Sequence, residues 1–295
     1  MTTTHIQPFF DSYSSTFSYV LHTTNSKDCA VIDSVLDYNP NAGRTSTRSA
    51  EQIVSYICLK GLRLSWIIDT HAHADHLSAA AFLKQQLGGK TVIGQSITRV
   101  QKTFSDIFNL PDLALDGSQF DQLLADGQCI TVGGLKIEAM HVPGHTPADT
   151  AWHVHTPKDE ADIVFVGDTL FSPQEGTARC DFPGGSASQL YKSVGKLLSL
   201  PDDTRLFLCH SYLEGVADNP AAFCEHTVAQ QRTSNKHVKN GINEAEFVAM
   251  RTARDATLDM PRLIIPSVQA NIRAGNLPPA EANGIQYLKI PLNVL

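Results

Sequence analysis

The sequence predicts an α/β fold in which two sheets pack face to face and helices cover their outer sides. Short apolar runs with strand character alternate with amphipathic stretches, and this pattern occurs in both halves of the chain. With 295 residues, of which 42% are hydrophobic, the chain can bury the core of one large domain, alone or with an appendage.

Strands and helices alternate in the first half of the chain. The apolar runs predict strands at residues 17–21, 29–32, 64–68 and 90–93. Helical patterns cover residues 49–61, 76–87 and 96–108. Ser49 and Gln52 have the spacing of a capping box, and Gly61 is typical of a helix end.

The second half begins with predicted strands at residues 129–132, 135–140, 150–155 and 163–166. Gly133–Gly134 predicts a two-residue hairpin turn between the first two of these strands. Later elements are a helix at 186–198, a strand at 206–209, and helices at 221–232 and 243–258. The spacings Ser186–Gln189 and Asn243–Glu246 predict capped helix starts.

The segment Thr70–His76 places three histidines and one aspartate directly after the predicted strand 64–68. If the backbone stays extended, His71, His73 and Asp75 project to one side, because successive strand side chains alternate. Imidazole nitrogens and carboxylate oxygens suit zinc, iron or manganese. A lone histidine is usually a polar surface group, but this density of ligands predicts a metal site.

Histidine and aspartate also follow later predicted strands. His141 and His145 come after strand 135–140, Asp168 after strand 163–166, and His210 after strand 206–209. Functional side chains commonly lie on loops that a rigid sheet positions. Their recurrence at strand ends predicts that they join the metal site.

The composition argues against several classes of partner. The net charge of −7 disfavours non-specific binding to nucleic acid or to an anionic membrane surface. No stretch approaches the ~20 apolar residues needed to span a bilayer. The six cysteines form no C-x-x-C pair, and no signal-peptide pattern is present, so a disulfide scaffold is not expected. We expect a soluble, cytoplasmic protein.

Four motifs, in this order, resemble the signature of the metallo-β-lactamase superfamily. They are H-A-H-A-D-H (71–76), P-G-H-T (143–146), G-D-T-L-F (167–171) and the late His210. The resemblance covers roughly residues 8–215, and it implies a four-layer αβ/βα sandwich with the metal at one edge of the sheets. Residues 216–295 would form a helical extension packed on a single domain of residues 1–295. The ligand-capable set that it implies is His71, His73, Asp75, His76, His145, Asp168 and His210.

Two further segments resemble the persulfide dioxygenases of that superfamily. Residues 176–185, GTARCDFPGG, are similar to the G-x-x-R-x-D-F segment of the bacterial form, which carries a cysteine and P-G-G. Glyoxalase II enzymes tend to have G-x-G-R-x-F-E there. The tail, around residues 246–255 and 269–273, also resembles the C-terminal part of the dioxygenases.

The dioxygenase resemblance implies one Fe(II) per chain, bound by His71, His145 and Asp168. Two histidines and one carboxylate leave three coordination positions open, and a persulfide sulfur and dioxygen need neighbouring positions on one redox-active metal. The other four residues, which would then orient these ligands or serve as alternative ligands of a two-metal site, are His73, Asp75, His76 and His210.

The implied reaction oxidises glutathione persulfide with dioxygen and water to glutathione and sulfite. Arg179 is the candidate for binding a glutathione carboxylate, Asp181 for orienting Arg179, and Tyr212 for donating a hydrogen bond to the substrate. An ordinary ion pair is the plain alternative for Arg179 and Asp181. Further candidates for binding the tripeptide are Arg251, Arg254 and Arg273.

Alternatives remain open at this point. The first is a zinc or mixed-metal hydroxyacylglutathione hydrolase of glyoxalase II type, in which a bridging hydroxide attacks the acyl carbon. A non-catalytic sulfur-trafficking role is weaker, because every ligand is retained. Cys180 is interpreted as a bystander, and His153 and His155 as structural. The expected partners are small molecules, with no nucleic acid or membrane, and homodimers are common in the family.

Overall fold

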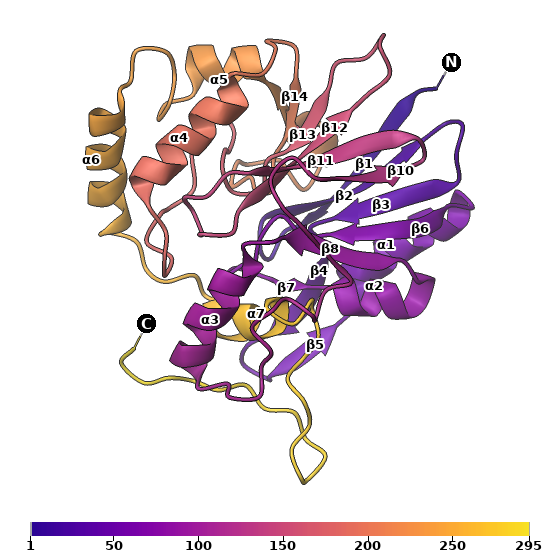
Figure 1. Ribbon diagram of the computed structural model, residues 1–295, viewed down its shortest axis with the longest axis vertical. Coiled ribbons are helices and arrows are strands. Elements are labelled where there is room, and N and C mark those ends of the chain that lie inside the picture. Colours follow the sequence, from indigo (N-terminus) through magenta and orange to yellow (C-terminus); the bar gives the residue numbers. More distant parts are fainter. Residues whose placement is uncertain (1, 295) are drawn as a thin grey trace.

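Figure 1 shows the computed structural model of the protein, which describes residues 2–294. Two six-stranded sheets pack face to face with helices outside, as the sequence predicts. The first sheet contains β1 (Thr4–Asp11), β2 (Thr16–Thr23), β3 (Asp28–Ile32), β6 (Arg63–Ile68), β8 (Lys90–Gly94) and β9 (Gln122–Leu124), in that order. The second contains β10 (Cys129–Val132), β11 (Leu135–His141), β12 (Thr150–His155), β13 (Ile163–Phe165), β14 (Arg205–Phe207) and β15 (Glu225–Thr227).

A smaller third sheet lies beside the first. It has the order β5 (Arg44–Ser46), β4 (Val35–Asn39), β7 (Leu77–Ser78). The helices are α1 (Arg48–Leu59), α2 (Ala80–Leu87), α3 (Ile97–Phe108), α4 (Ala187–Leu198), α5 (Val228–Ser234), α6 (Glu244–Asp255) and α7 (Ile264–Asn271). None of the helices within residues 2–294 is long and apolar enough to cross a membrane.

Large aromatic side chains fill the space between the two main sheets. Tyr19 of β2 lies 5.2 Å from Phe165 of β13 and 5.5 Å from Phe207 of β14, measured between ring centroids. Trp152 of β12 is fully buried in the same cluster. Burying each such side chain contributes about 1.5–3 kcal/mol, so this interface provides much of the driving force that joins the two sheets.

Helices complete the outer layers and one end of the sandwich. Residues of α1 and α2 pack with the outer side of the first sheet, and residues of α4 and α6 pack with the second. At the end of the sandwich, Phe104 of α3 and Val268 of α7 share a core cluster with Ala72, Ala74 and Phe182. The loops that contain residues 71–76 and 176–185 therefore pack against these two helices.

Several boundaries differ from the sequence predictions. Helix α1 has Thr47 at its N-cap with no side-chain cap, so the Ser49–Gln52 capping box is wrong; the Ser49 hydroxyl donates to Asp37 instead, at 2.9 Å. Helix α2 begins at Ala80 rather than at His76, because Leu77 and Ser78 pair with β4.

The predicted helix at 221–232 is also wrong. It divides into a 3-10 turn (Pro220–Ala222), strand β15 and helix α5. The Gly133–Gly134 turn and the Asn243–Glu246 capping box are confirmed. At α4 only half of the predicted box forms, since Ser186 accepts from the Gln189 amide.

Candidate metal centre

Four loops bring the predicted ligands together at one edge of the two sheets. Residues 71–76 follow β6, His145 lies between β11 and β12, and Asp168 and His210 follow β13 and β14. Their ligand atoms fall into two adjoining groups, in each of which all atoms lie within 4.8 Å of one another. The sequence prediction that these strand ends converge is confirmed for all of them except His141.

The first group consists of His71, His145 and Asp168. Asp168 Oδ2 lies 3.8 Å from His71 Nε2 and 3.5 Å from His145 Nε2. All three residues are buried. Two imidazoles and one carboxylate that converge in this way can bind one face of a divalent metal ion. The remaining coordination positions of that ion then stay open.

The second group consists of His73, Asp75, His76 and His210. His210 Nε2 lies 3.3 Å from Asp75 Oδ2 and 3.4 Å from Asp168 Oδ1. Asp168 therefore faces both groups, one oxygen toward each. The residues could hold one metal ion with supporting groups beside it, or two ions with Asp168 between them.

The backbone of residues 71–76 is not an extended strand, yet His71, His73 and Asp75 still gather at the site: His73 and Asp75 share the second group, and the ring centroids of His71 and His73 lie 4.0 Å apart. The chain bends after β6, and His71 and His73 belong to different groups. Asp33, at the end of β3, explains the bend: its carboxylate accepts from the Thr70 amide at 2.7 Å and contacts His73 Nε2 at 3.0 Å. No sequence motif marked Asp33, whose backbone φ is +51°.

Buried atoms without partners indicate that this set of residues fits a metal ion. Within the described residues, five buried ligand atoms of the site have no hydrogen-bond partner; they are His71 Nε2, His73 Nδ1, His76 Nε2, Asp168 Oδ1 and His210 Nε2. An unpaired buried polar group costs about 1–3 kcal/mol, which a shared cation would offset. Burial also lowers the pKa of His71 and His73 well below the ordinary value, which favours the neutral imidazole that binds metals.

The opposite ring nitrogens have partners that fix the orientation of the imidazoles. His145 Nδ1 donates to the Arg179 carbonyl at 2.7 Å, and His210 Nδ1 donates to the Ser15 carbonyl at 3.0 Å. These bonds place the proton on Nδ1 and leave the Nε2 lone pair facing Asp168.

A cavity of about 680 Å³ opens beside the first group, with His145, Asp168 and Asp75 in its wall. Apolar lining comes from Phe171, Leu213, Leu258 and Pro261. Basic side chains that line the same cavity are Arg179, Lys236, Arg251, Arg254 and Arg262. The arrangement combines an anion-attracting surface with a potential metal at one end of the cavity.

The predicted substrate-binding residues differ in how many bonds their side chains already make within the protein. Arg179 lines the cavity but forms a two-point ion pair with Asp181, at 2.5 and 2.6 Å, so the geometry agrees with the expected orientation of Arg179 by Asp181. Its Nη1 also donates to the Asp259 carbonyl at 2.6 Å. Tyr212 lines the cavity, with its ring parallel to that of His210 at a centroid distance of 6.0 Å.

Two of the predicted substrate-binding arginines are already bonded within the protein. Arg273 is not among the residues that line the cavity; its guanidinium donates to the Gln269 carbonyl on α7. Arg251 lines the cavity but is buried in an ion pair with Asp255, at 2.5 Å. Lys236 and Arg254 also line the cavity, and neither has an ion-pair partner within residues 2–294. The sequence analysis named Arg254 as a candidate for substrate binding, but not Lys236.

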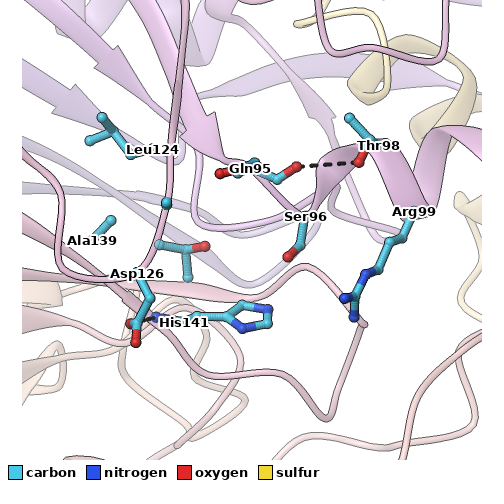
Figure 2. A pocket seen from close by; sticks show the side chains of 10 residues that line it. Gln95, Ser96, Thr98, Arg99, Leu124, Asp126, Ala139 and His141 are labelled. Carbon is cyan, nitrogen blue, oxygen red and sulfur yellow. Dashed lines mark hydrogen bonds between the residues drawn. The ribbon is translucent and has the colours of Figure 1, made fainter.

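His141 faces a separate cavity of about 320 Å³, which Figure 2 shows together with Ser96, Arg99 and Asp126. Its backbone amide donates to Asp126 at 2.7 Å. His141 is the last residue of β11, one residue beyond the strand end that the sequence predicts, and Pro143–Gly144 separate it from His145 of the metal groups.

Cys180 is buried, and burial raises the pKa of its thiol to about 12. A thiol in that state is unreactive, which agrees with its interpretation as a bystander. His153 and His155 lie near Asp162 at the far end of β12, where His153 Nε2 and Asp162 Oδ2 are 2.9 Å apart.

Gly144 of the P-G-H-T motif is expected to tolerate no side chain. Its φ is +152°, and a Cβ would lie 2.4 Å from the backbone of Leu190 in α4. Gly144→Ala should displace His145, lower stability by about 1–3 kcal/mol and reduce metal content. Gly195→Ala, on α4 where a Cβ meets nothing within 4 Å, is the matched control and should be neutral or slightly stabilising. Thermal unfolding and metal analysis of both variants test this; a Gly144→Ala protein with wild-type metal content would contradict it.

Sequence comparisons identify relatives along most of the chain. The profile described as "Metallo-beta-lactamase superfamily" matches residues 13–210. A protein of Burkholderia pseudomallei named a probable metallo-hydrolase is 52% identical over 98% of this chain and 99% of its own length. A Dictyostelium discoideum protein named "Glyoxylase B2" is 47% identical over 98% of this chain and 97% of its own.

More distant relatives include the human mitochondrial persulfide dioxygenase ETHE1, which is 30% identical over 92% of this chain and 88% of its own length. Among solved structures, ETHE1 from Myxococcus xanthus superimposes with a TM-score of 0.72 and 26% identity. That match covers 92% of this chain and all of the other, so it includes helices beyond the segment that the family profile covers.

Proposed function

This chain belongs to the metallo-beta-lactamase superfamily, and on that premise we propose that it is an enzyme that oxidises glutathione persulfide at a single Fe(II). Glutathione persulfide, dioxygen and water would give glutathione, sulfite and two protons. The sulfur–sulfur bond breaks, the terminal sulfur is oxidised, and dioxygen is the oxidant that is reduced.

The observation that carries the proposal is the group of two histidines and one aspartate at the wall of the cavity. His71, His145 and Asp168 can bind one metal from one side and leave the cavity side free for two small ligands. A bound Fe(II) would supply the redox chemistry by which dioxygen reacts with a persulfide sulfur, which zinc lacks. The likeness to persulfide dioxygenases over 92% of the chain supports this choice.

The residues around the group have distinct roles in this proposal. The Arg179 carbonyl keeps the proton of His145 on Nδ1, and Asp33 contacts the ring of His73 beside the site. Phe171 and Leu213 limit water around the sulfur end of the substrate. Tyr212 lies in the cavity wall, where its hydroxyl can donate to the substrate.

The substrate that fits the cavity is an anionic thiol derivative. Glutathione carries two carboxylates and one ammonium group, and the cavity has cationic side chains without ion-pair partners in the described chain, Lys236 and Arg254. Arg262 lies with its guanidinium carbon 4.0 Å from the centroid of the Tyr13 ring at the same cavity. A charged hydrogen bond contributes about 1.5–3 kcal/mol, enough to select an anionic carrier.

The decisive experiment uses protein purified without oxygen and analysed for each metal. We expect about one iron per chain, oxygen uptake on glutathione persulfide, and sulfite as product. Two zinc ions per chain together with hydrolysis of S-lactoylglutathione, and no oxygen uptake after iron loading, would reject the proposal.

A second candidate is a two-metal thiolester hydrolase. The position of Asp168, with one oxygen toward each group, favours it, because a carboxylate between two ions supports a bridging hydroxide. Relatives named as a metallo-hydrolase and a glyoxylase are more similar in sequence than the dioxygenases. The metal analysis described above separates the two candidates.

Replacing Arg254 by alanine is expected to raise KM for glutathione persulfide about tenfold with little change in kcat, because one charged contact to the substrate is lost. Arg99→Ala is the matched control: Arg99 is exposed at the other cavity (Figure 2) and should leave KM unchanged. Steady-state oxygen uptake measures both. Equal KM values in the two variants would exclude Arg254 from substrate binding.

A further inference from the structure

One buried amide of α7 is bonded to the loop that carries four of the candidate ligands. Asn271 Nδ2 donates to the carbonyls of His73 and His76, both at 2.8 Å, and Asn271 Oδ1 accepts from the Ser78 amide at 2.7 Å. The residue is 2% exposed. Both N–H groups and the oxygen of this side chain therefore bond to one segment, residues 73–78, which lies 193 to 198 residues earlier in the sequence.

A buried ion pair of α6, Arg251–Asp255, is likewise bonded to the backbone of a loop that lines the site. Arg251 Nη1 donates to the Thr177 carbonyl at 3.2 Å, and Asp255 Oδ2 accepts from the Cys180 amide at 2.8 Å. These two bonds flank Arg179, whose carbonyl accepts from His145 Nδ1. Helix α6 thus fixes the backbone group that sets the proton position on His145.

We propose that Asn271 and the Arg251–Asp255 pair are positioning residues of the metal centre. They contact no ligand atom, yet they determine where the ligand atoms lie: Asn271 through the backbone of residues 73–78, and the ion pair through the backbone of residues 177–180. The helices that follow residue 243 are in this way part of the structure that binds the metal. The inference requires a metal site but holds for either reaction considered above.

The physical basis is the sensitivity of metal affinity to ligand orientation. Groups that support ligands by hydrogen bonds typically change metal affinity 10–100-fold when they are removed. The bonds here are buried, so water cannot replace them without opening the helix–loop contact. Loss of Asn271 frees two carbonyls and one amide of the ligand loop at once.

Gln269 provides a matched control on the same helix. It is also a buried amide, and it also makes three bonds: Nε2 to the carbonyls of Ile265 and Lys289, and Oε1 from the Lys289 amide. None of these bonds involves the ligand loop. Gln269→Ala therefore reproduces the loss of a buried amide on α7 without the loss of ligand positioning.

The test is titration of metal-free protein with Co²⁺, monitored by its visible absorption and by competition with a chelator. We expect Asn271→Ala to weaken Co²⁺ binding at least about tenfold and to change the ligand-field spectrum. Gln269→Ala should keep both the affinity and the spectrum, even if the two metal-free variants unfold at similarly lowered temperatures. Asn271→Ser, which retains one hydroxyl, is the milder variant if Asn271→Ala does not fold.

Asp255→Asn tests the second contact, since it retains an oxygen for the Cys180 amide but loses the charge that pairs with Arg251. An intermediate loss of Co²⁺ affinity is expected, while Thr252→Ala on the exposed side of α6 should have none. Affinities of the Asn271 variants equal to that of Gln269→Ala would overturn the proposal. Because no turnover is measured, this outcome is independent of whether the enzyme proves to be an oxygenase or a hydrolase.

Discussion

Asp168→Ala is expected to abolish metal binding and turnover together. Asp168 Oδ2 belongs to the group with His71 and His145, and its Oδ1 lies 3.4 Å from His210, so this one side chain faces both groups. Because removal of a supporting group already costs 10–100-fold in affinity, loss of this ligand should lower metal affinity and activity by more than about 100-fold.

Metal content and oxygen uptake of the purified variant measure this prediction. His71→Ala should behave in the same way, since His71 supplies one of the two imidazoles of the first group. Asp162→Ala is the control, because Asp162 also contacts a histidine at 2.9 Å but lies at the far end of β12. An Asp168→Ala protein that retains full metal content and turnover would show that the centre lies elsewhere.

The ligands of the site could be predicted because each lies in a loop that follows an apolar run. His71, His145, Asp168 and His210 are visible as polar residues at predicted strand ends, and a sheet brings such ends to one edge. The groups that orient them could not be predicted. Asp33 lies 40 residues before His73, which it contacts, and nothing in its local sequence distinguishes it from an ordinary residue at a turn.

The substrate contacts were harder to predict, because the bonding partners of each arginine depend on the fold. Arg251 and Arg273 had the right charge, but in the fold one is neutralised by Asp255 and the other is bonded on its own helix. Ion pairing depends on tertiary neighbours, which a sequence does not show. The helix at 221–232 was wrong for a similar reason: residues 225–227 pair with β14, and this pairing outweighs their helical pattern.

Arg251→Ala is expected to destabilise the protein by about 3–5 kcal/mol, because it leaves the Asp255 carboxylate buried without its cation. Arg251 is 1% exposed, and its Nη2 lies 2.5 Å from Asp255 Oδ1. Urea unfolding of the metal-free protein measures the change. Arg63→Ala removes an ion pair of similar length from the surface, where Arg63 is 76% exposed, and should cost under about 1 kcal/mol.

The double variant Arg251→Met/Asp255→Leu separates the cost of an unpaired charge from the value of the pair. Replacing both charged groups by apolar side chains removes the uncompensated carboxylate, so stability should recover by a large part of the loss in Arg251→Ala. Metal affinity should nevertheless remain low, because neither apolar side chain can bond to Thr177 or Cys180. A double variant with recovered stability and wild-type metal affinity would mean that the ion pair stabilises the fold alone, whereas recovery of stability without recovery of affinity would show that α6 positions the ligands.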